Sequence, residues 1–180
     1  MKQFLEENPG YNVNSTDKDG RSGLDWSCRV GHLIETCKYL LSNSVALNLN
    51  VNQGNAFDAS PFLIACQEGN VDAMKLMMDH PQVNVNRPQH HGCTPLYIAC
   101  EKGSREAAAL LIQDPRIPKV SELARLCIHN DTQAIKNMLK CNPDLCVNEP
   151  GHQGNSPFFL ACSFGLEELA SILLEHPGID

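Results

Sequence analysis

The chain has 180 residues, of which 21 are acidic and 14 basic, so its formal net charge is −7 with neutral histidines. This acidic balance, with no run of Lys or Arg, argues against nucleic acid and against an anionic membrane surface as partners. Both carry negative charge and are bound mainly through positively charged side chains. No apolar stretch approaches the roughly 18 residues of a membrane-spanning helix, and the N-terminus lacks the apolar segment of a signal peptide. Nine cysteines cannot all pair within one chain, which indicates free, mostly buried thiols in a reducing compartment.

A ten-residue motif recurs along the chain, weakly from Ser22 and strongly from Ser60, Thr94 and Ser156. In the strong copies Ser or Thr precedes Pro; the hydroxyl caps the free N–H groups of a helix start, and Pro is tolerated in the first turn. The motif therefore predicts a short helix in each copy. We expect a glycine with positive φ to close that helix in each case. These glycines are Gly31, Gly69, Gly103 and Gly165.

Each short helix is followed by a second predicted helix, at residues 73–78, 107–112 and 169–174, which stops before a proline. An extended Val-Asn stretch such as 83–86 comes next, and then a polar turn that contains Gly92 or Gly154. Cysteines at the same place in successive copies lie about 34 residues apart, which indicates a repeat protein. These cysteines are Cys28, Cys66, Cys100, Cys127 and Cys162.

The order of turn, Thr/Ser-Pro, short helix, Gly, longer helix and Val-Asn resembles the ankyrin repeat. The resemblance covers essentially the whole chain and implies an all-α solenoid of helix-turn-helix pairs with β-turn fingers, as a single domain 1–180. The predicted units are approximately 17–52, 53–86, 87–117, 118–147 and 148–180, with 1–16 as the tail of a preceding unit. Because the last unit matches well and has no polar cap, we expect a fragment of a longer array.

Three units depart from the pattern. Gly23 replaces the proline of the first unit, and Asp58 replaces the turn glycine of the second, where Asp tolerates a left-handed backbone. The fourth unit has only five residues between Pro115 and Ser121, too few for a finger. Its helices are still predicted, at 121–127 and 133–139, with Asn130 in place of the closing glycine. We therefore expect a helix pair without a finger, and a notch in the row of turns.

Cysteines and histidines offer two candidate metal sites. His90, His91 and Cys93 lie on one turn, and Cys141 and Cys146 lie close together. A structural zinc site needs four converging ligands, usually as two close pairs, and neither group has a second pair. The first group is therefore interpreted as surface residues and the second as packing or loop residues. No phosphate-binding glycine loop, nucleophile elbow or HExxH helix is present either, so we predict no catalytic, cofactor-binding or metal-binding residue and no enzyme activity.

A stack of helix pairs forms an extended concave surface, and the resemblance places the partner-facing positions beside the turn glycine and after the Ala-Cys pair. Phe57, His90, His91 and Phe164 are the strongest candidates, because aromatic side chains are common at interface hot spots. The histidines also suggest binding that depends on pH near their unperturbed pKa of about 6.5. The predicted partner-binding residues are Lys18, Asp19, Arg21, Arg29, Phe57, Gln67, Glu68, His90, His91, Glu101, Lys102, His152, Gln153 and Phe164.

The predicted function is a non-catalytic protein–protein interaction module: a scaffold, adaptor or targeting segment. An alternative is the regulatory or substrate-recruiting domain of a larger enzyme whose catalytic part lies outside this chain. The resemblance also suggests hydroxylation of asparagines in the Val-Asn position, namely Asn84, Asn86 and Asn148. We expect a monomeric, intracellular protein in the cytoplasm or nucleus, with a protein partner and no cofactor.

Overall fold

The computed structural model describes residues 2–90, 92–117, 121–141, 147–148 and 155–179. The regular secondary structure in these ranges is helical, and the only β interaction among them is a single antiparallel bridge between Thr16 and Ser22. The prediction of an all-α fold is confirmed. The helices are α1 (Lys2–Glu7), α2 (Gly23–Arg29), the short 3₁₀ helix η1 (Gly31–Leu33), α3 (Ile34–Ser42), α4 (Pro61–Gln67), α5 (Val71–Met78), α6 (Pro95–Glu101), α7 (Arg105–Leu111), α8 (Glu122–His129), α9 (Thr132–Cys141), α10 (Pro157–Ser163) and α11 (Glu167–Leu174).

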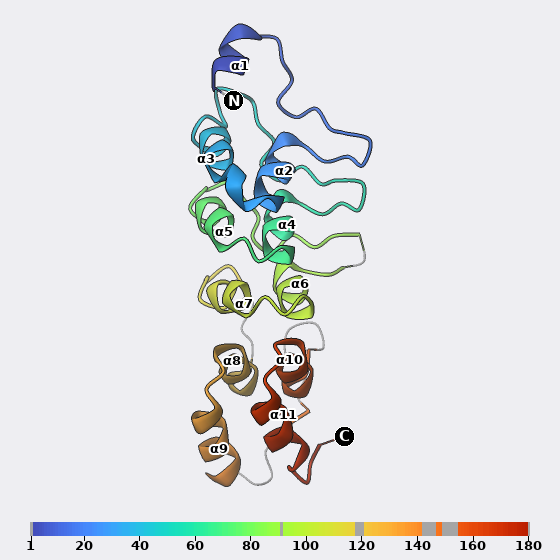
Figure 1. The fold of residues 1–180 in the computed structure, drawn as a ribbon, viewed down its shortest axis with the longest axis vertical. Coiled ribbons are helices and arrows are strands. Elements are labelled where there is room, and N and C mark those ends of the chain that lie inside the picture. The colour runs from blue at the N-terminus through green and yellow to red at the C-terminus, as the bar shows by residue number, and fades with distance from the viewer. Residues whose placement is uncertain (1, 91, 118–120, 142–146, 149–154, 180) are drawn as a thin grey trace. The chain divides into compact units, whose positions relative to one another are not determined.

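The chain divides into two compact units, residues 1–95 and 96–180. In the first unit α2 packs against α3 and α4, and α3 packs against α5, so that first helices contact first helices and second helices contact second helices (Figure 1). Phe62, Leu24 and Met74 are fully buried between these rows. Burial of such side chains stabilises each by roughly 1.5–3 kcal/mol, so neighbouring helix pairs depend on one another for their core.

Serine caps start the first helices, as the motif predicts. The Ser60 hydroxyl accepts a hydrogen bond from the Leu63 N–H at 3.2 Å, and Ser22, Ser121 and Ser156 cap α2, α8 and α10 in the same way. Each cap residue has an extended backbone. The Gly23 that replaces proline at the start of α2 therefore still follows a working cap.

Helix ends follow the prediction at four of five positions. Gly69, Gly103 and Gly165 have φ of +65° to +68°, and Asn130 takes the same left-handed conformation with φ of +57°. Gly31 is the exception: its φ is not positive, and it starts η1, while Val30 ends α2 with an extended backbone. The prediction for Gly31 is therefore wrong, because the chain passes directly into a 3₁₀ turn at this point and needs no left-handed residue.

Asparagine side chains connect successive repeats. The Asn52 side chain donates to the carbonyl of Gln82 at 2.6 Å and accepts from the backbone N–H of Asn84 at 2.8 Å. Asn14 makes the matching pair of bonds one repeat earlier in the first unit. In the second unit, the Asn148 side chain donates to the carbonyl of Gly178 at 2.6 Å. The amide can do this because it carries a donor and an acceptor on one short side chain.

The second unit has a different packing around α8. The connection before α8 spans 112–121, whereas the one before α6 spans 79–94. Within this unit α8 packs against α7, α9 and α10, and Figure 1 shows α8 next to α7 and α10 next to α6. A Cβ added to Gly103 would lie 2.5 Å from the Ser163 carbonyl oxygen, so the turn after α6 directly meets the end of α10. The fourth predicted helix pair therefore does not separate α6 from α10.

Candidate partner-binding cleft

Three successive turns of the first unit, called fingers here, lie side by side: residues 17–22, residues 55–59, and residues 89–90 with 92–93. The Ala56 N–H donates to the Asp19 carbonyl at 3.1 Å, and the His90 N–H donates to the Phe57 carbonyl at 3.2 Å. Gly20 permits this spacing, because its φ is +74° and an added Cβ would lie only 2.7 Å from the Ala56 nitrogen. Asp58 has φ of +58°, which confirms the predicted left-handed backbone at that position.

A cleft of about 470 Å³ lies between these fingers and the first helices of the first unit. It brings together five of the predicted partner-binding residues, Asp19, Arg21, Arg29, Phe57 and Gln67, which come from two fingers and from the ends of α2 and α4. Four further residues also line it: Asn55, Ala59, Ile64 and Gln89. The wall is therefore a mixture of charged groups, side-chain amides and apolar surface, as in specific binding sites.

Arg21 is held in place at one side of the cleft. Its Nε is 3.0 Å from Asp17 Oδ2, its guanidinium also pairs with Asp19, and its Cζ lies 4.6 Å from the centre of the Trp26 ring. Desolvation alone would raise the pKa of Asp17, but hydrogen bonds from the backbone of Arg21 and Asp19 and from the Trp26 and Arg21 side chains lower it to about 2. Arg21 is thus ordered before any partner arrives, which reduces the entropy lost on binding.

Arg29 links the ends of two first helices across the cleft. Its Nη1 is 2.7 Å from Glu68 Oε1, whereas its Nε is 3.9 Å from Oδ1 of the fully buried Asp25. Asn55 donates to the other Asp25 oxygen at 3.3 Å, but Asp25 Oδ1 and Arg29 Nε have no hydrogen-bond partner. Burial raises the pKa of Asp25, although Arg29 and Asn55 oppose the change. This buried carboxyl thus contacts two residues that line the cleft, Asn55 and Arg29.

Comparison with known proteins agrees with this architecture. Two family models match the chain: one described as "Ankyrin repeats (3 copies)" over residues 45–121, and one described as "Ankyrin repeat" over residues 153–180. The chain is an ankyrin-repeat protein. A solved crystal structure described as that of "EF0377 an Ankyrin Repeat Protein" is similar over 97% of this chain and 90% of that one, with a TM-score of 0.63 and 21% identity. No curated protein matches the chain.

Ankyrin repeats are in general protein–protein interaction modules, and two aromatic side chains are exposed in or beside the cleft. Phe57 is 67% exposed and Trp26 is 38% exposed. Phe57 was among the predicted residues; Trp26 was not, since its position in the repeat is normally apolar and buried. The presence of Trp26 close to Arg21 in the sequence could have identified it as a candidate, because Trp and Arg are both enriched at interface hot spots.

Among the described residues of this ankyrin-repeat protein, the other predicted ones do not line the cleft. Lys18 and His90 are exposed on the fingers of the first unit, and Glu68 is exposed beside the cleft, where it pairs with Arg29. In the second unit Glu101 and Lys102 are exposed, and Phe164 is half-buried at the end of α10, so it is not a free aromatic anchor. Three predictions lie outside the described residues: His91, His152 and Gln153.

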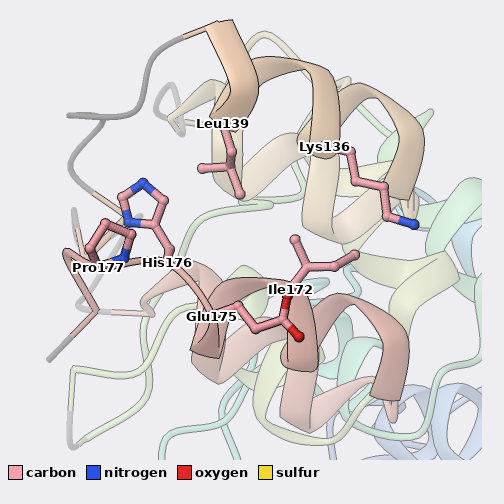
Figure 2. A pocket seen from close by; sticks show the side chains of 6 residues that line it. All are labelled: Lys136, Leu139, Ile172, Glu175, His176 and Pro177. Carbon is pink, nitrogen blue, oxygen red and sulfur yellow. The ribbon is translucent and has the colours of Figure 1, made fainter.

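Two smaller pockets recur at equivalent places between second helices. One of about 280 Å³ lies between α9 and α11 (Figure 2), and one of about 260 Å³ lies between α3 and α5. All six described residues that line the first pocket have an equivalent in the second, which Ser42 also lines, so the repeat itself generates both pockets. His80 Nε2 is 2.9 Å from the Ser44 hydroxyl, while His176 Nε2 is buried without a partner. The equivalent pairs are Lys38 and Lys136, Leu41 and Leu139, Leu76 and Ile172, Asp79 and Glu175, His80 and His176, and Pro81 and Pro177.

The described part of the chain offers neither a cluster of metal ligands nor a membrane span. There, no three His, Cys, Asp or Glu side chains converge in the way a metal ion requires. Cys93 is half-buried, whereas His91, Cys146 and the side chain of Cys141 are outside the described residues. None of the described helices is long and apolar enough to cross a bilayer.

The repeat-position cysteines are packing residues in four of five cases. Cys28, Cys66, Cys100 and Cys127 are buried, and burial raises the pKa of the Cys100 and Cys127 thiols to about 12. Such thiols are poor nucleophiles at neutral pH. Cys162 is exposed, so the prediction that it is a core residue is wrong. None of the described segments packs over this part of α10.

Proposed function

We propose that this chain is a non-catalytic module that binds a protein partner through the concave surface of its first unit, centred on the cleft beside Phe57, and that it serves as a scaffold, adaptor or targeting segment. The observation that supports this most directly is the convergence of Asp19, Arg21, Arg29, Phe57 and Gln67 on one cleft. These residues come from positions far apart in the sequence, and each occupies a place that varies between repeats.

The energetics of the cleft favour a macromolecular partner. Phe57 exposes two thirds of its surface, and burying such an aromatic side chain stabilises a complex by roughly 1.5–3 kcal/mol. Arg21 is fixed by Asp17, Asp19 and Trp26. A rigid, charged rim beside an exposed aromatic group is the arrangement found at protein interfaces, where a hydrophobic anchor is surrounded by polar contacts.

A photocrosslinking experiment tests the proposed surface. A benzophenone amino acid placed at position 57 should form covalent adducts with a partner in cells. The same group at position 45 should not, although Val45 is 87% exposed in the first unit and does not line the cleft. Equal adducts from the two positions, or adducts from position 45 alone, would place the partner on another surface.

A further inference from the structure

Three sulfur atoms meet in the core of the first unit. Cys28 Sγ lies 4.0 Å from Cys37 Sγ and 3.4 Å from Met77 Sδ. The three side chains come from α2, α3 and α5, and all are fully buried. Cys28, Cys37 and Met77 are called the sulfur cluster below.

The sulfur cluster is not a by-product of the repeat. Cys28 occupies a repeat position, but Cys37, which precedes Lys38, stands where the other second helices carry Met74, Ala108 or Ala170. Met77 stands where those helices carry Leu40, Leu111 or Leu173. Cys66, the counterpart of Cys28 in the next repeat, makes no hydrogen bond to another sulfur within the described residues. Two changes from the repeat pattern thus place sulfur around Cys28.

The contact between the two thiols changes both of them. The hydrogen bond with Cys37, together with burial, raises the pKa of Cys28, and the same hydrogen bond lowers the pKa of Cys37. A thiolate is the form in which cysteine binds a metal, so metal binding would displace the protons of both thiols. Nothing comparable affects Cys66, whose pKa burial raises.

We propose that Cys28, Cys37 and Met77 bind one Cu(I) ion. Thiolate and thioether sulfurs are the soft ligands that select Cu(I) over harder divalent cations. Metal–sulfur bonds of about 2.3 Å would separate the sulfurs of a trigonal site by about 4 Å. The two thiols are already 4.0 Å apart, whereas Met77 Sδ, at 3.4 Å from Cys28 Sγ, would have to move outward by about half an ångström. On binding, both thiol protons pass to the solvent, and the ion is held by two thiolates and one thioether with one net negative charge.

The ion enters when the cluster opens, since the three side chains are fully buried. We expect this opening to involve α3, whose N-cap residue Leu33 makes no side-chain capping hydrogen bond and which follows a single 3₁₀ turn. Movement of α3 away from α2 exposes both thiols together. We therefore expect uptake of Cu(I) to be slower than ligand exchange at a surface thiol, and to be accelerated by a low concentration of urea.

Anaerobic titration of the intact chain with Cu(I), in competition with the chelator bicinchoninate, tests the site. The wild type should retain one ion per chain, with an X-ray absorption spectrum of sulfur ligands at about 2.3 Å. Cys37→Ala and Met77→Leu should weaken retention by at least about tenfold to a hundredfold. Both variants introduce residues that the repeat carries at equivalent positions, so they should fold, which circular dichroism checks.

Cys66→Ala is the matched control, because Cys66 is equally buried in the same unit and should leave retention unchanged. Retention by Cys37→Ala and Met77→Leu at the wild-type level would overturn the proposal, as would a wild-type chain that loses all its copper to the chelator. An equal loss in Cys66→Ala would also overturn it, since copper would then bind to thiols in general.

Discussion

Replacing Asn52 by alanine should weaken the link between two successive repeats of the first unit. The side chain makes two hydrogen bonds to the backbone of the next connection, at 2.6 and 2.8 Å. Each such bond contributes about 1 kcal/mol net, and the released backbone groups lie near solvent and can bind water. We therefore expect Asn52→Ala to lower the free energy of unfolding by about 1–2 kcal/mol.

Asn84→Ala provides the comparison, because the Asn84 side chain accepts only a local bond from the N–H of Asn86. It should cost about 0.5 kcal/mol. Urea unfolding followed by circular dichroism gives both values, and hydrogen exchange localises the effect. The backbone amide of residue 84 should exchange faster in Asn52→Ala, since it loses its acceptor, and should be unchanged in Asn84→Ala. Equal destabilisation by the two variants, or unchanged exchange at residue 84 in Asn52→Ala, would refute the proposed link.

Further predictions concern a cap, a left-handed residue and a buried acid. Ser60→Ala should destabilise the first unit by about 1 kcal/mol and Ser60→Thr by less, as measured by urea unfolding. Asn130→Ala should cost about 1 kcal/mol in thermal unfolding, whereas Asn130→Gly should not, because φ is +57° there. Burial raises the pKa of Asp25, so its ionisation lowers stability as the pH rises through the unfolded and then the folded pKa. Asp25→Asn should therefore lose less stability than the wild type between acidic and neutral pH; an identical pH profile would contradict this.

The helices and their ends were predictable because local chemistry decides them. A serine before proline caps α4, and glycine or asparagine with positive φ closes the first helices, whatever the rest of the chain does. Gly31 was mispredicted because the same residue also fits a 3₁₀ turn. The choice between the two depends on how α3 packs against α2, which the local sequence does not contain.

The cleft was predictable only in part. The repeat register identified Asp19, Arg21, Arg29, Phe57 and Gln67, because equivalent positions face the same side in every repeat. It did not identify Trp26, which lies beside the cleft, or the Asp25–Arg29 pair within α2, since the repeat register does not fix which side chains of one repeat contact each other. The packing of α8 against α7 was likewise not predicted. A short connection restricts the position of the next helix, but it does not determine which helix the next one packs against. The single domain and its five unit boundaries stay predictions.

The proposed hydroxylation of asparagines also stays a prediction. Asn84 is exposed, while Asn86 and Asn148 are half-buried. Asn148 uses its side-chain amide to donate to Gly178, so its modification would compete with a contact between repeats. Mass spectrometry of the native protein distinguishes the three: we expect any hydroxylation at Asn84, and modification confined to Asn148 would contradict that order.

Partner affinity in matched variants tests the central claim most directly. Phe57→Ala and Val45→Ala each remove an exposed apolar side chain from the first unit, but only Phe57 lines the cleft. With the crosslinked partner in hand, calorimetry should show that Phe57→Ala weakens binding by about tenfold or more, as expected for truncation of a hot-spot residue. Val45→Ala should change the affinity by less than about twofold. Unchanged affinity in Phe57→Ala, or an equal loss in Val45→Ala, would contradict the assignment of this cleft as the binding surface.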